Sequence, residues 1–176
     1  AARGATFIAT PENTTLMAPD GGAKLASSYD EAHDPALPVF AALARQLNVW
    51  LLIGSLAIKV SDTHTANRSF LVSPDGAVTA RYSKINLFDV ALASGEVYRE
   101  SNTVSGGGDA VVAQTPWGGV GLTICYDVRF PQLYRRLAQK GAFAFTVPAA
   151  FTVPTGSAHW HVLLRARAIE NGAFVI

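Results

Sequence analysis

Apolar residues along this chain occur in short runs that follow two kinds of spacing. Continuous or alternating apolar runs are typical of strands, and apolar residues three and four positions apart are typical of helices. Such runs predict strands at residues 5–9, 50–58, 69–73, 77–82, 111–114, 120–125, 143–148 and 173–176. Helical spacing predicts helices at residues 38–47, 132–139 and 158–170. This alternation predicts a layered α/β fold with a hairpin region between residues 50 and 82.

The segments between these runs contain Gly, Pro and polar residues, which predict connections. They give loops at residues 18–36, 93–109 and 149–157, and turns at residues 64–68, 74–76 and 117–119. In a compact domain a loop as long as 93–109 is often functional.

The composition fits one globular domain that spans residues 1–176. Apolar residues make up 49% of the chain and charged residues 15%, which excludes a disordered protein. The net charge of +1, without a basic run, argues against nucleic-acid binding. The apolar runs are broken by Gly, Pro or charge, so we expect no membrane span. A single cysteine excludes an internal disulfide, which fits the reducing cytoplasm.

That cysteine, Cys125, ends a predicted strand and is followed at once by Tyr126, Asp127 and Arg129. A nucleophile on such a strand-to-helix elbow projects out of its sheet, and the next backbone N–H groups can bind an oxyanion. A helix N-terminus near the sulfur would favour the thiolate. The alternative is that Cys125 packs in the core as a small hydrophobic residue.

Three charged residues before Cys125 could complete a catalytic site. Glu12 and Lys84 follow predicted strands, and Glu100 lies in the long loop. A cysteine nucleophile needs a base and oxyanion donors, so Glu12 could be the base, Lys84 the donor and Glu100 a positioning group. The alternative is an ordinary solvated acid or lysine at a strand end. Spacing in sequence does not decide between these readings.

A metal site is not expected. His159 and His161 are two positions apart on a predicted helix, so they point to different faces, and one cysteine cannot build a zinc site. We therefore expect no metal and no other cofactor.

The chain resembles the nitrilase, or carbon–nitrogen hydrolase, superfamily, and within it the Nit-type amidase branch. The resemblance covers essentially all of the chain and rests on FIATPE at 7–12, YSKINLFDV at 82–90, YRES at 98–101, GLTICYDVRFP at 121–131, and TGSAHW at 155–160 followed by LLRARAIEN at 163–171. It implies a four-layer αββα sandwich. Relatives have further strands and helices on both sides, so we expect the fold to be incomplete at both ends.

The resemblance also implies the roles of the site residues. Glu12, Lys84 and Cys125 would form a triad, with Glu100 as a second, supporting glutamate. Glu12 would act as general base while Cys125 attacks an amide carbonyl, forms a thioester and releases ammonia. Water activated by Glu12 would then release the acid, and Lys84 with the N–H of Tyr126 would hold the oxyanion.

Other residues receive less definite expectations. Asp127 and Arg129 would fix the elbow or, alternatively, form a surface ion pair. Arg129, or Arg99 on the long loop, would bind a substrate carboxylate unless it is simply exposed. The sequence departs from the family pattern at three positions: Asn86 replaces a common His, and Gln132 and His161 replace Glu. None of these is a triad member, but His161 would lie near the pocket, so the identity of the substrate stays undecided.

The resulting hypothesis is a cytoplasmic amidase that acts on a small carboxylate-bearing amide. The 163–171 stretch favours deaminated glutathione, and an omega-amidase acting on α-ketoglutaramate-like compounds is second. A nitrilase and a non-catalytic binding or scaffold protein are further alternatives. The presence of all four candidate catalytic residues argues against a scaffold. The resemblance also suggests a homodimer or larger homo-oligomer.

Overall fold

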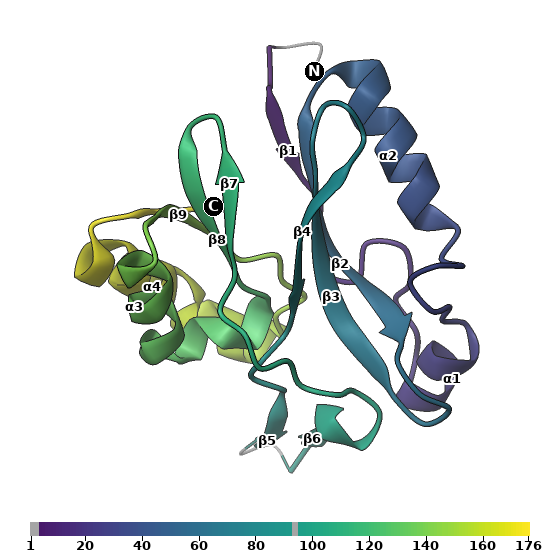
Figure 1. The fold of residues 1–176 in the computed structure, drawn as a ribbon. Coiled ribbons are helices and arrows are strands. Elements are labelled where there is room, and N and C mark those ends of the chain that lie inside the picture. Colours follow the sequence, from purple (N-terminus) through teal and green to yellow (C-terminus); the bar gives the residue numbers. More distant parts are fainter. Residues whose placement is uncertain (1–3, 93–94) are drawn as a thin grey trace.

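The computed structural model describes residues 4–92 and 95–176, and in these residues the strands form two four-stranded sheets. The first sheet contains β1 (Phe7–Ala9), β2 (Trp50–Lys59), β3 (Thr65–Val72) and β4 (Val78–Ser83). The second contains β7 (Val112–Thr115), β8 (Gly118–Leu122), β9 (Ala142–Thr146) and β10 (Phe174–Val175). Helices α1 (Gly21–Ala26) and α2 (Ala36–Leu47) lie outside the first sheet, and α3 (Pro131–Gln139) and α4 (Val153–Asn171) outside the second (Figure 1). The predicted four-layer αββα sandwich is confirmed, with both sheets open.

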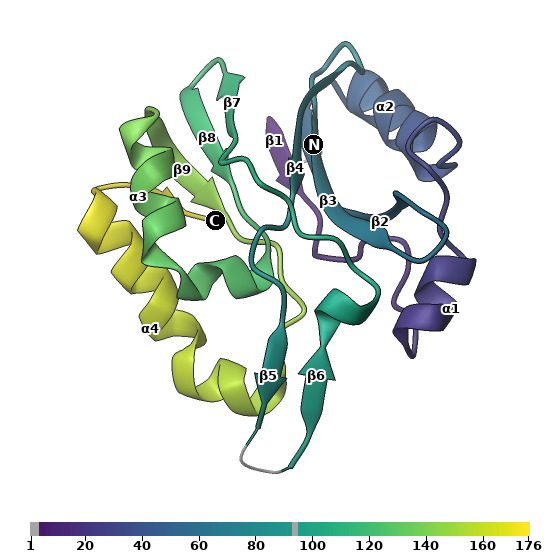
Figure 2. The same cartoon turned by 60° about the horizontal axis from the view of Figure 1, so that its bottom comes forward.

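The strand order follows from the connections. Strands separated in sequence by a helix pair in parallel: β1 with β2, β8 with β9, and β9 with β10. Short turns instead join antiparallel neighbours, which are β2 with β3, β3 with β4, and β7 with β8. A separate antiparallel pair, β5 (Asp89–Ala91) and β6 (Val97–Arg99), extends beyond one end of the two sheets (Figure 2). This end of the sandwich carries the candidate site.

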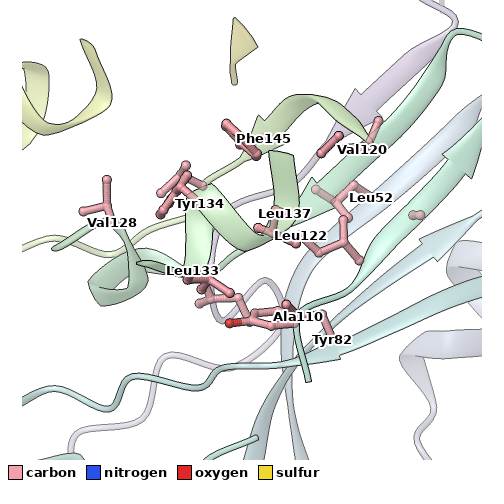
Figure 3. Packing of buried hydrophobic residues seen from close by; sticks show 14 of the residues in the cluster. Leu52, Tyr82, Ala110, Val120, Leu122, Val128, Leu133, Tyr134, Leu137 and Phe145 are labelled. Atoms are coloured by element: carbon pink, nitrogen blue, oxygen red, sulfur yellow. The ribbon is translucent and has the colours of Figure 1, made fainter. Parts of the chain in front are cut away.

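Strand β2 is apolar on both faces because it lies between two cores. Leu52 packs into the cluster between the sheets, together with Leu122, Leu137 and Phe145 (Figure 3). Its neighbours Leu51 and Ile53 face the other way, toward α2, in a second buried cluster. Burial of such side chains stabilises each by about 1.5–3 kcal/mol.

A β-bulge between Ile53 and Leu56 interrupts the alternation in β2. After the bulge Leu56 and Ile58, rather than their odd-numbered neighbours, join the cluster under α2. The extra residue keeps one face of the strand apolar while the backbone bends next to Gly54.

Several sequence predictions are wrong. Residues 65–68, predicted as a turn, belong to strand β3, where Asn67 and Thr65 are buried despite being polar. The predicted loop 18–36 contains α1, whose first turn is capped by the Asp20 carboxylate accepting from the Ala23 N–H at 2.8 Å. Helix α4 begins at Val153, inside the predicted loop 149–157. The predicted loop 93–109 contains β6, and its residues 93 and 94 lie outside the described part of the chain.

Within the described residues, no helix combines the length and apolar character that a membrane crossing needs.

Candidate active site

A cavity of about 370 Å³ opens at the end of the sandwich marked by β5 and β6. Residues from several separate segments line it, among them Glu12, Lys84, Glu100 and Cys125. Glu12 and Cys125, which are 113 positions apart in the chain, therefore meet at one place. The structure brings together the four residues that the sequence selected as candidates.

Glu12 reaches the cavity because the chain after β1 passes directly over Gly54. A Cβ atom at position 54 would lie 2.1 Å from the carbonyl oxygen of Thr10 and 2.3 Å from that of Pro11, so only glycine fits. The Gly54 N–H donates to Thr10 Oγ1 at 2.9 Å, and Asn13 N–H donates to Ser55 Oγ at 2.8 Å. These contacts on both sides of Glu12 fix the backbone that carries it.

The three charged side chains form one buried ion cluster. Lys84 Nζ lies 3.2 Å from Glu12 Oε1, and 3.2 and 3.0 Å from the two carboxylate oxygens of Glu100. Lys84 is only 2% exposed. Glu12 Oε2 also accepts from the backbone N–H of Ala150 at 2.8 Å, and Glu100 Oε2 from that of Phe88 at 2.6 Å. Every charge in the cluster has a partner, as buried charges require.

The same contacts set the protonation states. Burial disfavours the Glu12 carboxylate, but Lys84, the Ala150 N–H, the Cys125 thiol and Asn67 together outweigh it and hold the pKa of Glu12 below its ordinary 4.5. Burial likewise opposes the charge on Lys84, yet the two glutamates raise the pKa of Lys84 above its ordinary 10.5. Near neutral pH, Glu12 is therefore a carboxylate and Lys84 an ammonium.

Cys125 departs from the predicted geometry. Strand β8 ends at Leu122, and Cys125 begins a 3₁₀ helix, η2 (Cys125–Arg129), with a left-handed φ of 48°. That conformation is rare for a residue with a Cβ atom and is concentrated at functional sites. The backbone N–H of Cys125 donates to Pro148 O at 2.9 Å, which secures the turn.

The expectation that the elbow favours a thiolate is wrong. Burial and the neighbouring Glu12 carboxylate raise the pKa of the Cys125 thiol, and Lys84 offsets only part of this effect. The raised pKa keeps the thiol protonated near neutral pH. A base must therefore remove its proton before the sulfur can act as a nucleophile.

Asp127 holds the elbow through buried hydrogen bonds rather than through a surface ion pair. It is fully buried, and its Oδ2 accepts from Tyr82 Oη at 2.6 Å and from Ile124 N at 2.9 Å. Its Oδ1 accepts from Asn86, through the backbone N–H at 3.0 Å and the side chain at 2.8 Å. Burial raises the pKa of Asp127 despite these donors. Asn86 therefore links the segment after Lys84 to the elbow that carries Cys125.

Arg129 stands beside the cavity and is not among the described residues that line it. Its guanidinium lies over the rings of Tyr126, at 5.7 Å, and Phe151, at 5.3 Å, and contacts His159 Nδ1 at 3.3 Å. Arg99 does line the cavity.

The two remaining departures from the family pattern lie outside the cavity. Gln132 is exposed on α3. His161 lines a neighbouring, more open hollow next to Trp160.

Three contributors to the site were missed in the sequence. Asn67 Nδ2 donates to Glu12 Oε1 at 2.9 Å, Ala150 supplies a backbone N–H, and Lys24 lines the cavity wall from α1. Asn67 lies in the polar stretch 64–68, which predicts a turn, so nothing in the sequence marks its buried position. The Ala150 backbone N–H and the position of Lys24 on the short helix α1 likewise leave no signal in the sequence.

Comparison with known proteins shows the family of the chain. Residues 1–176 match the carbon-nitrogen hydrolase family. The chain is 41% identical over 179 residues to deaminated glutathione amidase of Yersinia enterocolitica, covering 98% of this chain and 61% of that protein. It is 35% identical over 154 residues to omega-amidase NIT3 of Saccharomyces cerevisiae, covering 84% and 53%.

A solved structure also resembles the chain. The crystal structure of the Caenorhabditis elegans NitFhit protein matches with a TM-score of 0.90 and 34% identity, over 99% of this chain and 43% of that one. The chain thus spans less than two thirds of the length of each of these relatives. On the family match and these likenesses, the chain belongs to the carbon-nitrogen hydrolase family.

Proposed function

We propose that this chain carries the catalytic residues of a thiol-dependent amidase that hydrolyses a small carboxylate-bearing amide to an acid and ammonia. One observation carries the proposal: Cys125, Glu12 and Lys84 line one cavity, with Lys84 Nζ 3.2 Å from Glu12 Oε1. A nucleophile, a base and a cation for the oxyanion are the parts that acyl transfer needs.

In the first half-reaction Glu12 takes the Cys125 proton as the sulfur attacks the amide carbonyl carbon. The carbonyl electron pair moves to the oxygen, where Lys84 and the N–H of Tyr126 stabilise the charge. The first N–H groups of a helix have no intrahelical partner, which suits the one that follows Cys125. Collapse breaks the carbon–nitrogen bond, and the leaving nitrogen takes the proton back from Glu12 as ammonia.

In the second half-reaction the thioester is hydrolysed. Glu12, ionised again, accepts a proton from water, and the resulting hydroxide attacks the thioester carbonyl. The carbon–sulfur bond then breaks, the acid leaves, and the proton on Glu12 returns to the sulfur. Glu100 accepts from Lys84 Nζ with both carboxylate oxygens, so it acts as a positioning residue.

The substrate class follows from the cations at the cavity wall. Lys24 and Arg99 both line the cavity, and neither forms an ion pair within 4.0 Å among the described carboxylates. Both can therefore bind a carboxylate of the substrate. The names of the relatives favour deaminated glutathione, and an omega-amidase substrate of the α-ketoglutaramate type is the second candidate. The homo-oligomeric state and the cellular compartment stay predictions.

Replacing Arg99 should weaken binding of acidic substrates selectively. Arg99→Gln is expected to raise KM for a carboxylate-bearing amide about fivefold, which corresponds to about 1 kcal/mol for an exposed ion pair, and to leave kcat nearly unchanged. Steady-state kinetics on the acidic amide and on a neutral aliphatic amide measure the effect. Arg135→Gln, an exposed change on α3, is the control. An equal rise in KM for the neutral amide would contradict the carboxylate role.

The proposed function is tested by ammonia release from a panel of compounds. The panel contains deaminated glutathione, α-ketoglutaramate, glutamine, asparagine and a simple nitrile. Release from one of the first two identifies the substrate, and release from the nitrile alone would favour a nitrilase. No release from any compound, together with slow alkylation of Cys125, would support a non-catalytic binding protein.

A further inference from the structure

Asn67 contacts both charged members of the triad without touching the cavity. It lies on β3, is 4% exposed and is not among the described residues that line the cavity. Its side-chain Nδ2 donates to Glu12 Oε1 at 2.9 Å, and its backbone oxygen accepts from the Lys84 N–H at 2.9 Å. One residue of the strand therefore fixes the carboxylate of Glu12 and the backbone of Lys84 together.

The donors around Glu12 are distributed unequally between its two oxygens. A carboxylate oxygen has two lone pairs. Oε1 accepts from Asn67 and from Lys84 Nζ, which uses both, while among the N–H donors of the described residues Oε2 accepts only from Ala150. The remaining lone pair therefore lies on Oε2, and the thiol of Cys125 is hydrogen-bonded to this carboxylate.

We propose that Asn67 is a positioning residue that occupies Oε1 of Glu12 and so directs the proton of Cys125 to Oε2. This inference rests on the proposed function of the site. In the step concerned the S–H bond breaks and an Oε2–H bond forms, while sulfur bonds to the carbonyl carbon and the carbonyl electron pair moves to its oxygen. With Oε1 held by Asn67 and Lys84, and Oε2 by the Ala150 N–H, the carboxylate keeps one orientation during this transfer.

The other half of the Asn67 amide supports a functional reading. Its Oδ1 is buried and has no hydrogen-bond partner in the described part of the chain. Leaving a buried acceptor unsatisfied destabilises a fold. The unsatisfied Oδ1 of the amide therefore costs stability, while its Nδ2 donates to Glu12. Such a local cost is expected where a residue is kept for function.

The test compares Asn67→Leu with the wild-type full-length protein over a range of pH. We expect kcat to fall about ten- to a hundredfold, the range of one hydrogen bond to a charged group, with KM unchanged because Asn67 does not line the cavity. Loss of a donor raises the pKa of Glu12, so the acid limb of the pH profile should move to higher pH. Ser69→Ala removes another buried hydrogen bond of β3, to the Gly54 carbonyl, and should leave the acid limb in place.

Alkylation of Cys125 by iodoacetamide gives a second readout that needs no substrate. Its rate should show the same displaced acid limb in Asn67→Leu, even if no amide in the panel is turned over and the proposed function fails. If the leucine variant does not fold, Asn67→Ser, with a shorter donor, takes its place in both measurements. An unchanged acid limb in a folded variant, or an equal shift in Ser69→Ala, would overturn the proposal.

Discussion

Cys125→Ala should abolish ammonia release while leaving the fold intact. The thiol is the nucleophile of the proposed mechanism, and removal of a nucleophile lowers kcat by roughly 10⁴- to 10⁶-fold in enzymes whose catalytic groups act as a unit. The alanine fits because the site loses only one sulfur atom, and it removes a protonated thiol rather than a charge. The measurement is ammonia release from the best substrate of the panel, with circular dichroism as the check on folding.

Cys125→Ser is the matched control for this prediction. It keeps a hydroxyl in the cavity that Glu12 lines and tests whether a poorer nucleophile suffices. We expect activity far below wild type, because a serine hydroxyl is less reactive than a thiol that Glu12 deprotonates. Some residual turnover by the alanine variant is expected, because the rest of the site still binds the substrate. Turnover close to that of the wild type would contradict the thioester mechanism.

Lys84→Met should have the largest combined effect on activity and stability. The change leaves the buried carboxylate of Glu12 and the partly buried carboxylate of Glu100 without their shared cation. Breaking a buried pair in this way costs about 3–5 kcal/mol, and loss of an oxyanion donor lowers kcat about 10²- to 10³-fold. Urea unfolding monitored by circular dichroism and steady-state kinetics measure the two effects separately.

The loss of stability in Lys84→Met should depend on pH in a defined direction. In the wild type the pKa of Glu12 is depressed, so its contribution to stability is present above pH 4.5 and is lost as pH falls through the lower folded-state pKa. In the variant, burial is no longer offset by Lys84, and the pKa of Glu12 rises. The gap between wild type and variant should therefore be large at neutral pH and shrink on acidification.

A double variant separates charge from chemistry. Lys84→Met combined with Glu100→Gln removes the cation together with one of its two carboxylates. We expect it to regain part of the lost stability and none of the activity. A double variant no more stable than Lys84→Met would show that packing of the lysine, rather than its charge, holds the cluster.

The sequence predicted the strands and helices best where apolar residues are continuous. Residues 50–58 are apolar on both faces because β2 lies between two cores, and such a run has few other readings. The prediction of a turn at residues 65–68 is wrong because Thr65 and Asn67 are buried polar residues. Their hydrogen-bond partners, the Thr103 carbonyl and the Glu12 carboxylate, come from distant segments. Helix α1 is not predicted from the sequence because its six residues include two glycines and so have little intrinsic preference for a helix.

The candidate site shows the same division. The motifs that carry Glu12, Lys84, Glu100 and Cys125 are local in sequence, so all four residues could be selected in advance. The geometry around Cys125 could not be predicted, because its left-handed φ accompanies a hydrogen bond to Pro148, and its raised pKa comes from burial and from Glu12, all of which only the folded chain provides. The roles of these residues remain for the experiments above.

Glu12 connects the ion cluster to the second sheet through the Ala150 N–H. Glu12 and Lys84 are carried by the segments after β1 and β4, whereas Cys125 and Ala150 follow β8 and β9. A small separation of the sheets would break the Glu12 contacts to Ala150 and Cys125 before the sheets themselves unravel. Catalysis should therefore vanish at denaturant concentrations below the global unfolding midpoint, and amide hydrogen exchange at Ala150 should report the same early opening.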